Sequence, residues 1–173
     1  TYVLRDLAFW DIYYEHCSYF TKGSLARLFR RCGFDVLCLS TEYDDQYLTI
    51  EAKPSRGMGN GMHAGEDDLD EVRLLVHRFL EEYPKHLRRW AKTMENIQLE
   101  QKKAIIWGAG SKGVAFFTAL GISADVMPYA VDINPHKRGT FMAGSGQEIV
   151  MPDFLKEYRP DVVIYMPVSN DLY

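Results

Sequence analysis

The sequence has few cysteines, no long hydrophobic run and no large excess of charge of one sign. Its three cysteines, Cys17, Cys32 and Cys38, are odd in number and lack the spacing of a zinc-binding pair. We therefore expect neither a metal site nor a disulfide framework, but reduced thiols in a cytoplasmic protein. The longest apolar run, 162–168, contains Pro167 and is far shorter than the roughly 18 residues of a membrane-spanning helix. The sequence thus predicts no membrane association.

The charge is nearly balanced, with 20 Lys and Arg against 24 Asp and Glu in 173 residues, a formal net charge of −4. Nucleic-acid-binding proteins concentrate basic residues on one face, so we expect no nucleic-acid partner. The basic run 85–92 around Trp90 is typical of a solvated helix face. Because the chain begins at Thr1 without a methionine or a leader, we also expect a fragment of a longer polypeptide without a targeting signal.

The N-terminal third predicts one helix followed by two strands. Apolar residues recur every three or four positions over 24–32, and Thr21 or Ser24 is a suitable N-cap residue for this helix. Residues 34–39 and 46–52 read as two strands joined by a tight turn. These elements are too few to form a core, so we expect them to close a larger sheet.

A glycine-rich segment separates this part from a long helical pattern. Residues 54–66 contain little that can pack, which is typical of a linker. Apolar residues then recur at helical spacing over 67–101, and we expect Pro84 to kink or split the helix.

From residue 104 onward, strand and helix patterns alternate. This alternation predicts an α/β fold, with a Rossmann-like parallel sheet and right-handed crossovers. The expected strands are 104–107, 126–131 and 161–165, and the expected helices are 114–120 and 152–158.

The turn between the first strand and helix of this part has the sequence Gly108-Ala-Gly110-Ser-Lys112-Gly113. Glycines let the backbone approach a phosphate, and the N–H groups at the start of a helix bind it. Asp132 follows the next expected strand, where a ribose-binding acid would lie. Lys112 suits a separate phosphate or carboxylate. The turn can therefore bind a dinucleotide or another ligand, or it can simply join strand to helix.

Two further segments combine chemically active residues. The loop 132–139, which includes Lys137, follows a strand and is either a ligand-binding or a plain surface loop. Near the N-terminus, a histidine is close in sequence to a carboxylate and several phenols. These groups could tune the pKa of the histidine and orient its ring. The side chains are therefore either catalytic, or packed in the fold without a catalytic role. The residues are Tyr13, Tyr14, Glu15, His16 and Tyr19.

The order and identity of these motifs resemble S-adenosylmethionine-dependent sugar C-methyltransferases. That family has a Tyr-x-Glu-His motif before a helix and a final hairpin, then a Gly-Ala-x-x-Lys-Gly turn and a Val-Asp-x-Asn-Pro-x-Lys-x-Gly segment. Where the family has a Pro-Gly pair after the last of these motifs, this chain has Ala143-Gly144. The matching residues here are Tyr13, Glu15, His16, Gly108, Ala109, Lys112, Gly113, Val131, Asp132, Asn134, Pro135, Lys137 and Gly139.

The resemblance implies the last portion of a three-part enzyme. Residues 1–53 would end the methyltransferase domain, 54–66 would be a linker, and 67–173 would be a helical segment with a substrate-binding domain. A zinc module and the main S-adenosylmethionine-binding residues would lie upstream of Thr1. The partners implied are that upstream domain and a nucleotide-linked 4-keto-6-deoxy sugar.

The resemblance also implies roles for individual residues. His16 would remove the proton next to the ketone, Glu15 would orient His16, and Tyr13 would hydrogen-bond the enolate oxygen. Two other functions stay open from the residues themselves: an NAD(P)-dependent oxidoreductase built on the glycine turn, and a non-catalytic nucleotide-binding or ligand-binding domain. The expected substrate-binding residues are Gly108, Gly110, Lys112, Gly113, Asp132 and Lys137.

Overall fold

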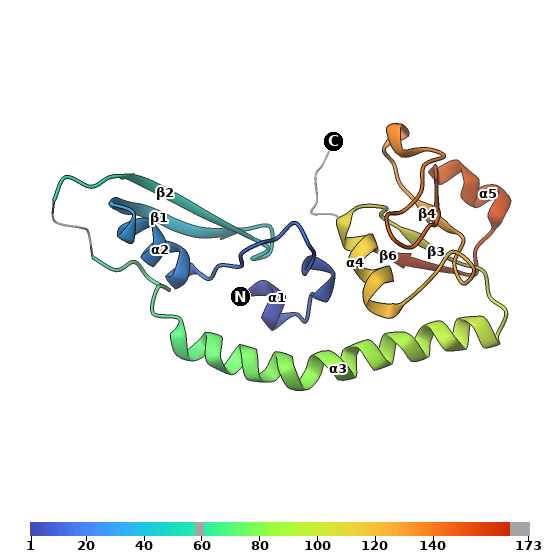
Figure 1. Cartoon of the computed structure of the whole chain (residues 1–173), viewed down its shortest axis with the longest axis horizontal. Coiled ribbons are helices and arrows are strands. Elements are labelled where there is room, and N and C mark those ends of the chain that lie inside the picture. The colour runs from blue at the N-terminus through green and yellow to red at the C-terminus, as the bar shows by residue number, and fades with distance from the viewer. Residues whose placement is uncertain (58–60, 167–173) are drawn as a thin grey trace. The chain divides into compact units, whose positions relative to one another are not determined.

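The computed structural model describes residues 1–57 and 61–166 (Figure 1). The chain forms two compact units. Among the described residues, the first unit combines Thr1–Ala8 with Glu15–Glu82, and the second combines Phe9–Tyr14 with residues 83–166. Within the described residues, no helix is both long and apolar enough to cross a membrane.

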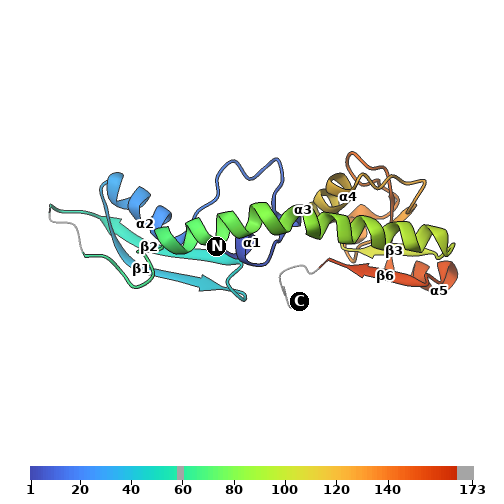
Figure 2. The ribbon, with the colours of Figure 1, turned by 90° about the horizontal axis from the view of Figure 1, so that it is seen from below.

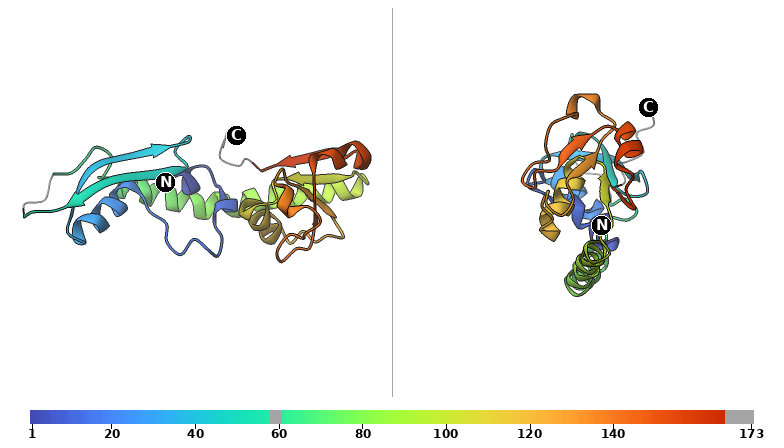
Figure 3. Two further views of the ribbon diagram at one scale, coloured as in Figure 1. Left: turned by 90° about the horizontal axis from the view of Figure 1, so that it is seen from above. Right: turned by 90° about the vertical axis from the view of Figure 1, so that its right-hand side faces the viewer.

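The first unit contains α1 (Tyr2–Arg5), α2 (Lys22–Arg31) and an antiparallel hairpin of β1 (Phe34–Glu42) and β2 (Tyr47–Pro54). Helix α2 lies along the hairpin (Figure 3). The predicted helix and both strands are present. Strand β1 ends three residues later than expected, and β2 begins one residue later and ends two residues later.

Both suggested N-terminal residues cap α2. The Thr21 hydroxyl accepts a hydrogen bond from the Ser24 N–H, and the Ser24 hydroxyl accepts one from the Thr21 N–H. This reciprocal arrangement satisfies two N–H groups that the helix itself cannot pair.

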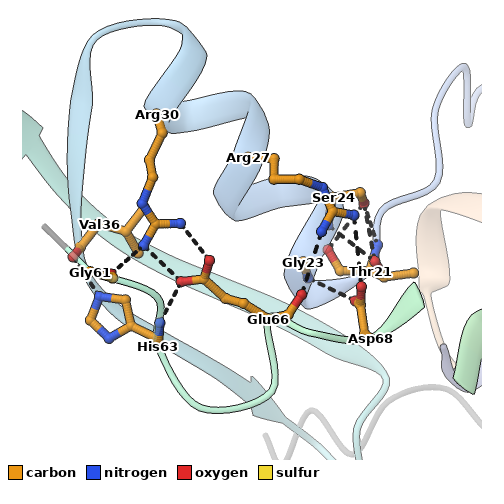
Figure 4. A network of polar contacts seen from close by, with 10 residues as sticks. All are labelled: Thr21, Gly23, Ser24, Arg27, Arg30, Val36, Gly61, His63, Glu66 and Asp68. Carbon is orange, nitrogen blue, oxygen red and sulfur yellow. Dashed lines mark hydrogen bonds and ion pairs between the residues drawn. The ribbon is translucent and has the colours of Figure 1, made fainter. Parts of the chain in front are cut away.

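The segment that precedes α3 (Leu69–Leu99) is tied to α2 by side chains of both segments (Figure 4). Glu66, only 1% exposed, binds the guanidinium of Arg30, and the backbone N–H of His63 donates to the same carboxylate. Asp68 accepts a hydrogen bond from the Gly23 N–H in the first turn of α2. Residues 63–68 are thus packed against α2 within the first unit. Residues 58–60 of the expected linker lie outside the described residues.

Helix α3 runs without interruption from Leu69 to Leu99, so of the two expected effects of Pro84, a kink or a split, the split is wrong. Proline removes one backbone hydrogen bond and crowds the preceding turn, at a cost of about 3 kcal/mol. The apolar residues on both sides of Pro84 offset that cost by packing: Tyr83, Leu87 and Trp90 lie against the core of the second unit. The basic residues of 85–92 are exposed on the opposite face, as expected.

The second unit has a four-stranded sheet in which all neighbouring strands are parallel, in the order β5-β4-β3-β6. This confirms the predicted α/β fold class. Strands β3 and β6 lie side by side (Figure 2). The strands are β3 (Ala104–Trp107), β4 (Tyr129–Val131), β5 (Glu148–Val150) and β6 (Val162–Tyr165), and the helices after β3 and β5 are α4 (Ser111–Leu120) and α5 (Leu155–Tyr158).

Two features of the sheet differ from expectation. Strand β4 begins only at Tyr129, because the N–H groups of Val126 and Met127 bond to Ser123 in a turn and Pro128 has no N–H. Strand β5 was not predicted, since its three residues follow a glycine-rich loop and are too few to show a pattern.

The sheet is covered on both faces. One face packs on α4, on the C-terminal half of α3 and on Phe9, and it includes Ile106 and Ala130. The other packs on α5 and the short helix before it through Tyr129, Phe154 and Tyr158. The face that packs on α5 stays open along the edge strand β6, where Val163 and Tyr165 are 47% and 58% exposed.

Candidate functional site

The glycine turn after β3 contains two glycines that the fold requires and one that it does not. Gly108 has φ +116°, and a Cβ there would lie 3.2 Å from Met166. At Gly113 a Cβ would lie 2.4 Å from the Gly108 carbonyl oxygen. Around Gly110, the N-cap residue of α4, a Cβ would meet nothing within 4 Å. The absent side chain at Gly110 therefore leaves open space beside the N-terminus of α4.

This turn lies where ligands bind in open α/β sheets. The strands that follow β3 are added first on one side, as β4 and β5, and then on the other, as β6. In other open α/β sheets, ligands bind at the carboxyl ends of the strands where the strand order reverses in this way. The N–H groups in the first turn of α4 have no partners within the helix and favour an anion.

Lys137 joins the ends of two neighbouring strands. Its ammonium donates to the Asp132 carboxylate at 2.7 Å and to the Ala109 carbonyl at 3.1 Å. The second oxygen of Asp132 accepts from the Asn134 N–H at 2.9 Å. Both Asp132 oxygens thus accept a hydrogen bond within the protein, and each keeps a second lone pair.

Lys112 pairs with Asp11, a residue that lies 101 positions earlier in the chain. The Lys112 ammonium is 3.5 Å from the Asp11 carboxylate, and the two side chains are 20% and 14% exposed. No local sequence pattern marks Asp11 as a functional residue, because nothing in such a pattern indicates a contact over this distance. Both residues belong to the second unit.

The predicted catalytic residues follow one another on an irregular segment between residues 12 and 21. Tyr13 is half-buried, whereas Glu15 and His16 are exposed. The His16 ring packs edge-on against Tyr19, with ring centroids 5.7 Å apart. Tyr13 belongs to the second unit, and Glu15 and His16 belong to the first.

No group of three metal-binding side chains gathers anywhere in residues 1–57 or 61–166. The three cysteines are exposed free thiols.

Residues 62–170 match the family described as the C-methyltransferase C-terminal domain, and the chain belongs to this family. It is also similar to a curated relative, C-methyltransferase NovU from Streptomyces niveus. The two are 24% identical over 172 residues, which cover 95% of this chain and 41% of that protein. The chain therefore spans less than half the length of the relative. These matches confirm the resemblance to C-methyltransferases that the motifs indicated.

Proposed function

We propose that this chain is the C-terminal portion of an S-adenosylmethionine-dependent methyltransferase that methylates a carbon of a nucleotide-linked 4-keto-6-deoxy sugar. The observation that carries the proposal is the open backbone at Gly110, at the N-terminus of α4 and at the carboxyl end of β3. A glycine that the fold does not need suits close approach of a phosphate. The membership of the chain in the C-methyltransferase family supplies the reaction class.

The nucleotide diphosphate binds at the glycine turn, Gly108–Gly113, flanked by Lys112 and Lys137. Each lysine faces an aspartate, at 3.5 Å for Lys112 and 2.7 Å for Lys137. Because these side-chain charges balance, the attraction for the diphosphate comes largely from the backbone N–H groups of α4. An ammonium has three donors, so each lysine can also donate to a phosphate oxygen.

His16 removes the proton from the carbon next to the ketone, and the electrons of that C–H bond pass to the ketone oxygen as an enolate. Tyr13 donates a hydrogen bond to this oxygen, and Glu15 orients the His16 ring. A well-placed base contributes about 10²–10⁴-fold in rate. The exposure of His16 leaves its ring accessible to a substrate.

S-adenosylmethionine supplies an electrophilic methyl group on a sulfonium. We assign its binding to the methyltransferase domain of the parent protein, to which residues 1–53 contribute the closing hairpin. The exposed thiols of Cys17, Cys32 and Cys38 suit a reducing compartment, so we assign the protein to the cytoplasm.

The test uses the full-length parent protein and a panel of nucleoside-diphosphate-linked 4-keto-6-deoxyhexoses. In deuterium oxide without a methyl donor, mass spectrometry should detect exchange of one proton next to the ketone. With a methyl-labelled donor, the label should appear on that same carbon. Transfer of the label to an oxygen or nitrogen, or exchange at the same rate without enzyme, would contradict the proposal.

A further inference from the structure

We infer that Asp11 is a positioning residue: through Lys112 it holds the segment that carries Tyr13 at the N-terminal end of α4. The second unit, rather than the remnant of the methyltransferase domain, would then position the phenol that stabilises the enolate. This inference rests on the proposed function, because it gives Tyr13 its role there.

The segment Phe9–Tyr14 is built into the second unit although it precedes Tyr83 by some 70 residues. Phe9 is 2% exposed, and its ring stacks on Phe116 of α4 with centroids 6.0 Å apart. It also contacts His86 of α3, at 5.9 Å between ring centroids. This burial anchors the start of the segment in the core.

Asp11 anchors the other end of the same short helix, Phe9–Asp11. Its carboxylate and the Lys112 ammonium are mostly shielded from water, so their attraction is stronger than that of an exposed pair. Lys112 lies in the first turn of α4, directly after Gly110 and Ser111. The pair therefore links the helix Phe9–Asp11 to the turn that we assign to the substrate.

Tyr13 lies only two residues beyond Asp11, so its Cα stays within about 7 Å of the Asp11 Cα. Fixing Asp11 against Lys112 thus restricts where the Tyr13 phenol can lie relative to the glycine turn. A displacement of about 1 Å in a reacting geometry can cost about 100-fold in rate. We therefore expect loss of the ion pair to act on the enolisation step.

The test compares Asp11→Asn with wild type in the full-length protein. Asp153→Asn is the matched control, because it removes the charge of another Asp–Lys pair of the same unit, 2.8 Å long but exposed. Asp11→Asn should slow deuterium exchange at the substrate by about tenfold, and Asp11→Glu should restore most of the rate. Asp153→Asn should exchange at the wild-type rate.

A double-mutant cycle with Tyr13→Phe separates positioning from simple stabilisation. If Asp11 acts by placing Tyr13, then Tyr13→Phe should cost much less in the Asp11→Asn background than in wild type. Additive effects of the two substitutions on the exchange rate would overturn the inference.

A second measurement does not depend on catalysis. Amide hydrogen exchange of residues 9–14 should be faster in Asp11→Asn than in wild type or Asp153→Asn, and unchanged exchange there would also overturn the inference. Should the wild type enolise no keto sugar, the proposed function fails, while this measurement still decides whether Asp11 holds the segment.

Discussion

Arg30 and Glu66, 36 residues apart, form a bidentate ion pair. The Arg30 Nη2 donates to the Glu66 Oε1 at 2.8 Å, and the Arg30 Nη1 donates to the Glu66 Oε2. The Glu66 side chain is almost completely buried, and a backbone N–H from His63 also donates to it. The contact joins α2 to the segment before α3 (Figure 4). The ion pair therefore holds the segment before α3 against α2.

Replacing Glu66 by Gln should destabilise the first unit by about 3 kcal/mol, because the guanidinium of Arg30 would lose its negatively charged partner, and one of its two acceptor oxygens, in a largely buried place. Tryptophan fluorescence reports the second unit, since Trp10, Trp90 and Trp107 all belong to it. In urea, the midpoint seen by circular dichroism should fall more than the midpoint seen by tryptophan fluorescence.

The matched control for Glu66→Gln is Asp70→Asn. It removes the pair of Asp70 with Arg73, in which the two side chains are 95% and 66% exposed. This change should cost no more than about 1 kcal/mol. Equal losses in the two variants would mean that burial adds nothing to the Arg30–Glu66 pair.

The same pair predicts a pH dependence. The hydrogen bonds from Arg30, together with that from the His63 backbone, hold the pKa of Glu66 below its ordinary value of 4.5, against the opposing effect of burial. The stabilisation is fully present well above pH 4.5 and is lost as the pH falls through the lowered pKa. The difference in unfolding free energy between wild type and Glu66→Gln should therefore be large at pH 7 and shrink on acidification. A constant difference from pH 7 to pH 3 would contradict this assignment.

Substitutions at Gly113 and Gly110 should have different effects on stability and on ligand binding. Gly113→Ala should destabilise the second unit by about 2 kcal/mol, because the new methyl group would overlap the Gly108 carbonyl. Gly110→Ser should leave stability unchanged or slightly raised, since serine is a favoured N-cap residue and its Cβ meets open space. In the full-length protein, Gly110→Ser should nevertheless weaken binding of the nucleotide sugar by about tenfold or more. If calorimetry shows undiminished binding in Gly110→Ser, the glycine turn is not part of the substrate site.

His16→Asn in the full-length protein should lower turnover by two or more orders of magnitude and leave the affinity for S-adenosylmethionine nearly unchanged. Asparagine keeps a similar size and a hydrogen-bonding edge, and His16 is exposed, so misfolding is not expected. Tyr13→Phe should lower turnover less, because it removes one hydrogen bond to the enolate oxygen and leaves the base, His16, in place. Exchange of the substrate proton at the wild-type rate in His16→Asn would mean that another residue is the base.

The 173-residue chain alone should bind S-adenosylmethionine weakly or not at all. The glycine turn of the described residues is the one we assign to the sugar nucleotide, and we assign the cofactor to the methyltransferase domain of the parent protein. Calorimetric titration should show no binding at micromolar concentrations. A micromolar dissociation constant would place the cofactor site within this chain.

The sequence by itself determined the fold class and the family. Apolar periodicity and glycine positions are local properties, so the parallel sheet, the hairpin and the long helix followed from spacings of two, three and four residues. The motifs around His16, Lys112 and Asp132 identified the C-methyltransferase family for the same reason: each is a short run whose residues stand in order along the chain.

Only the tertiary structure decided which distant residues meet. The pairs of Asp11 with Lys112 and of Arg30 with Glu66 join segments far apart in sequence, and no periodicity encodes them. The three-residue strand β5 forms because β4 offers it an edge, and α3 continues through Pro84 because packing on both sides outweighs one missing hydrogen bond. Such contacts depend on the free energy of the whole packed unit, which a local pattern does not contain.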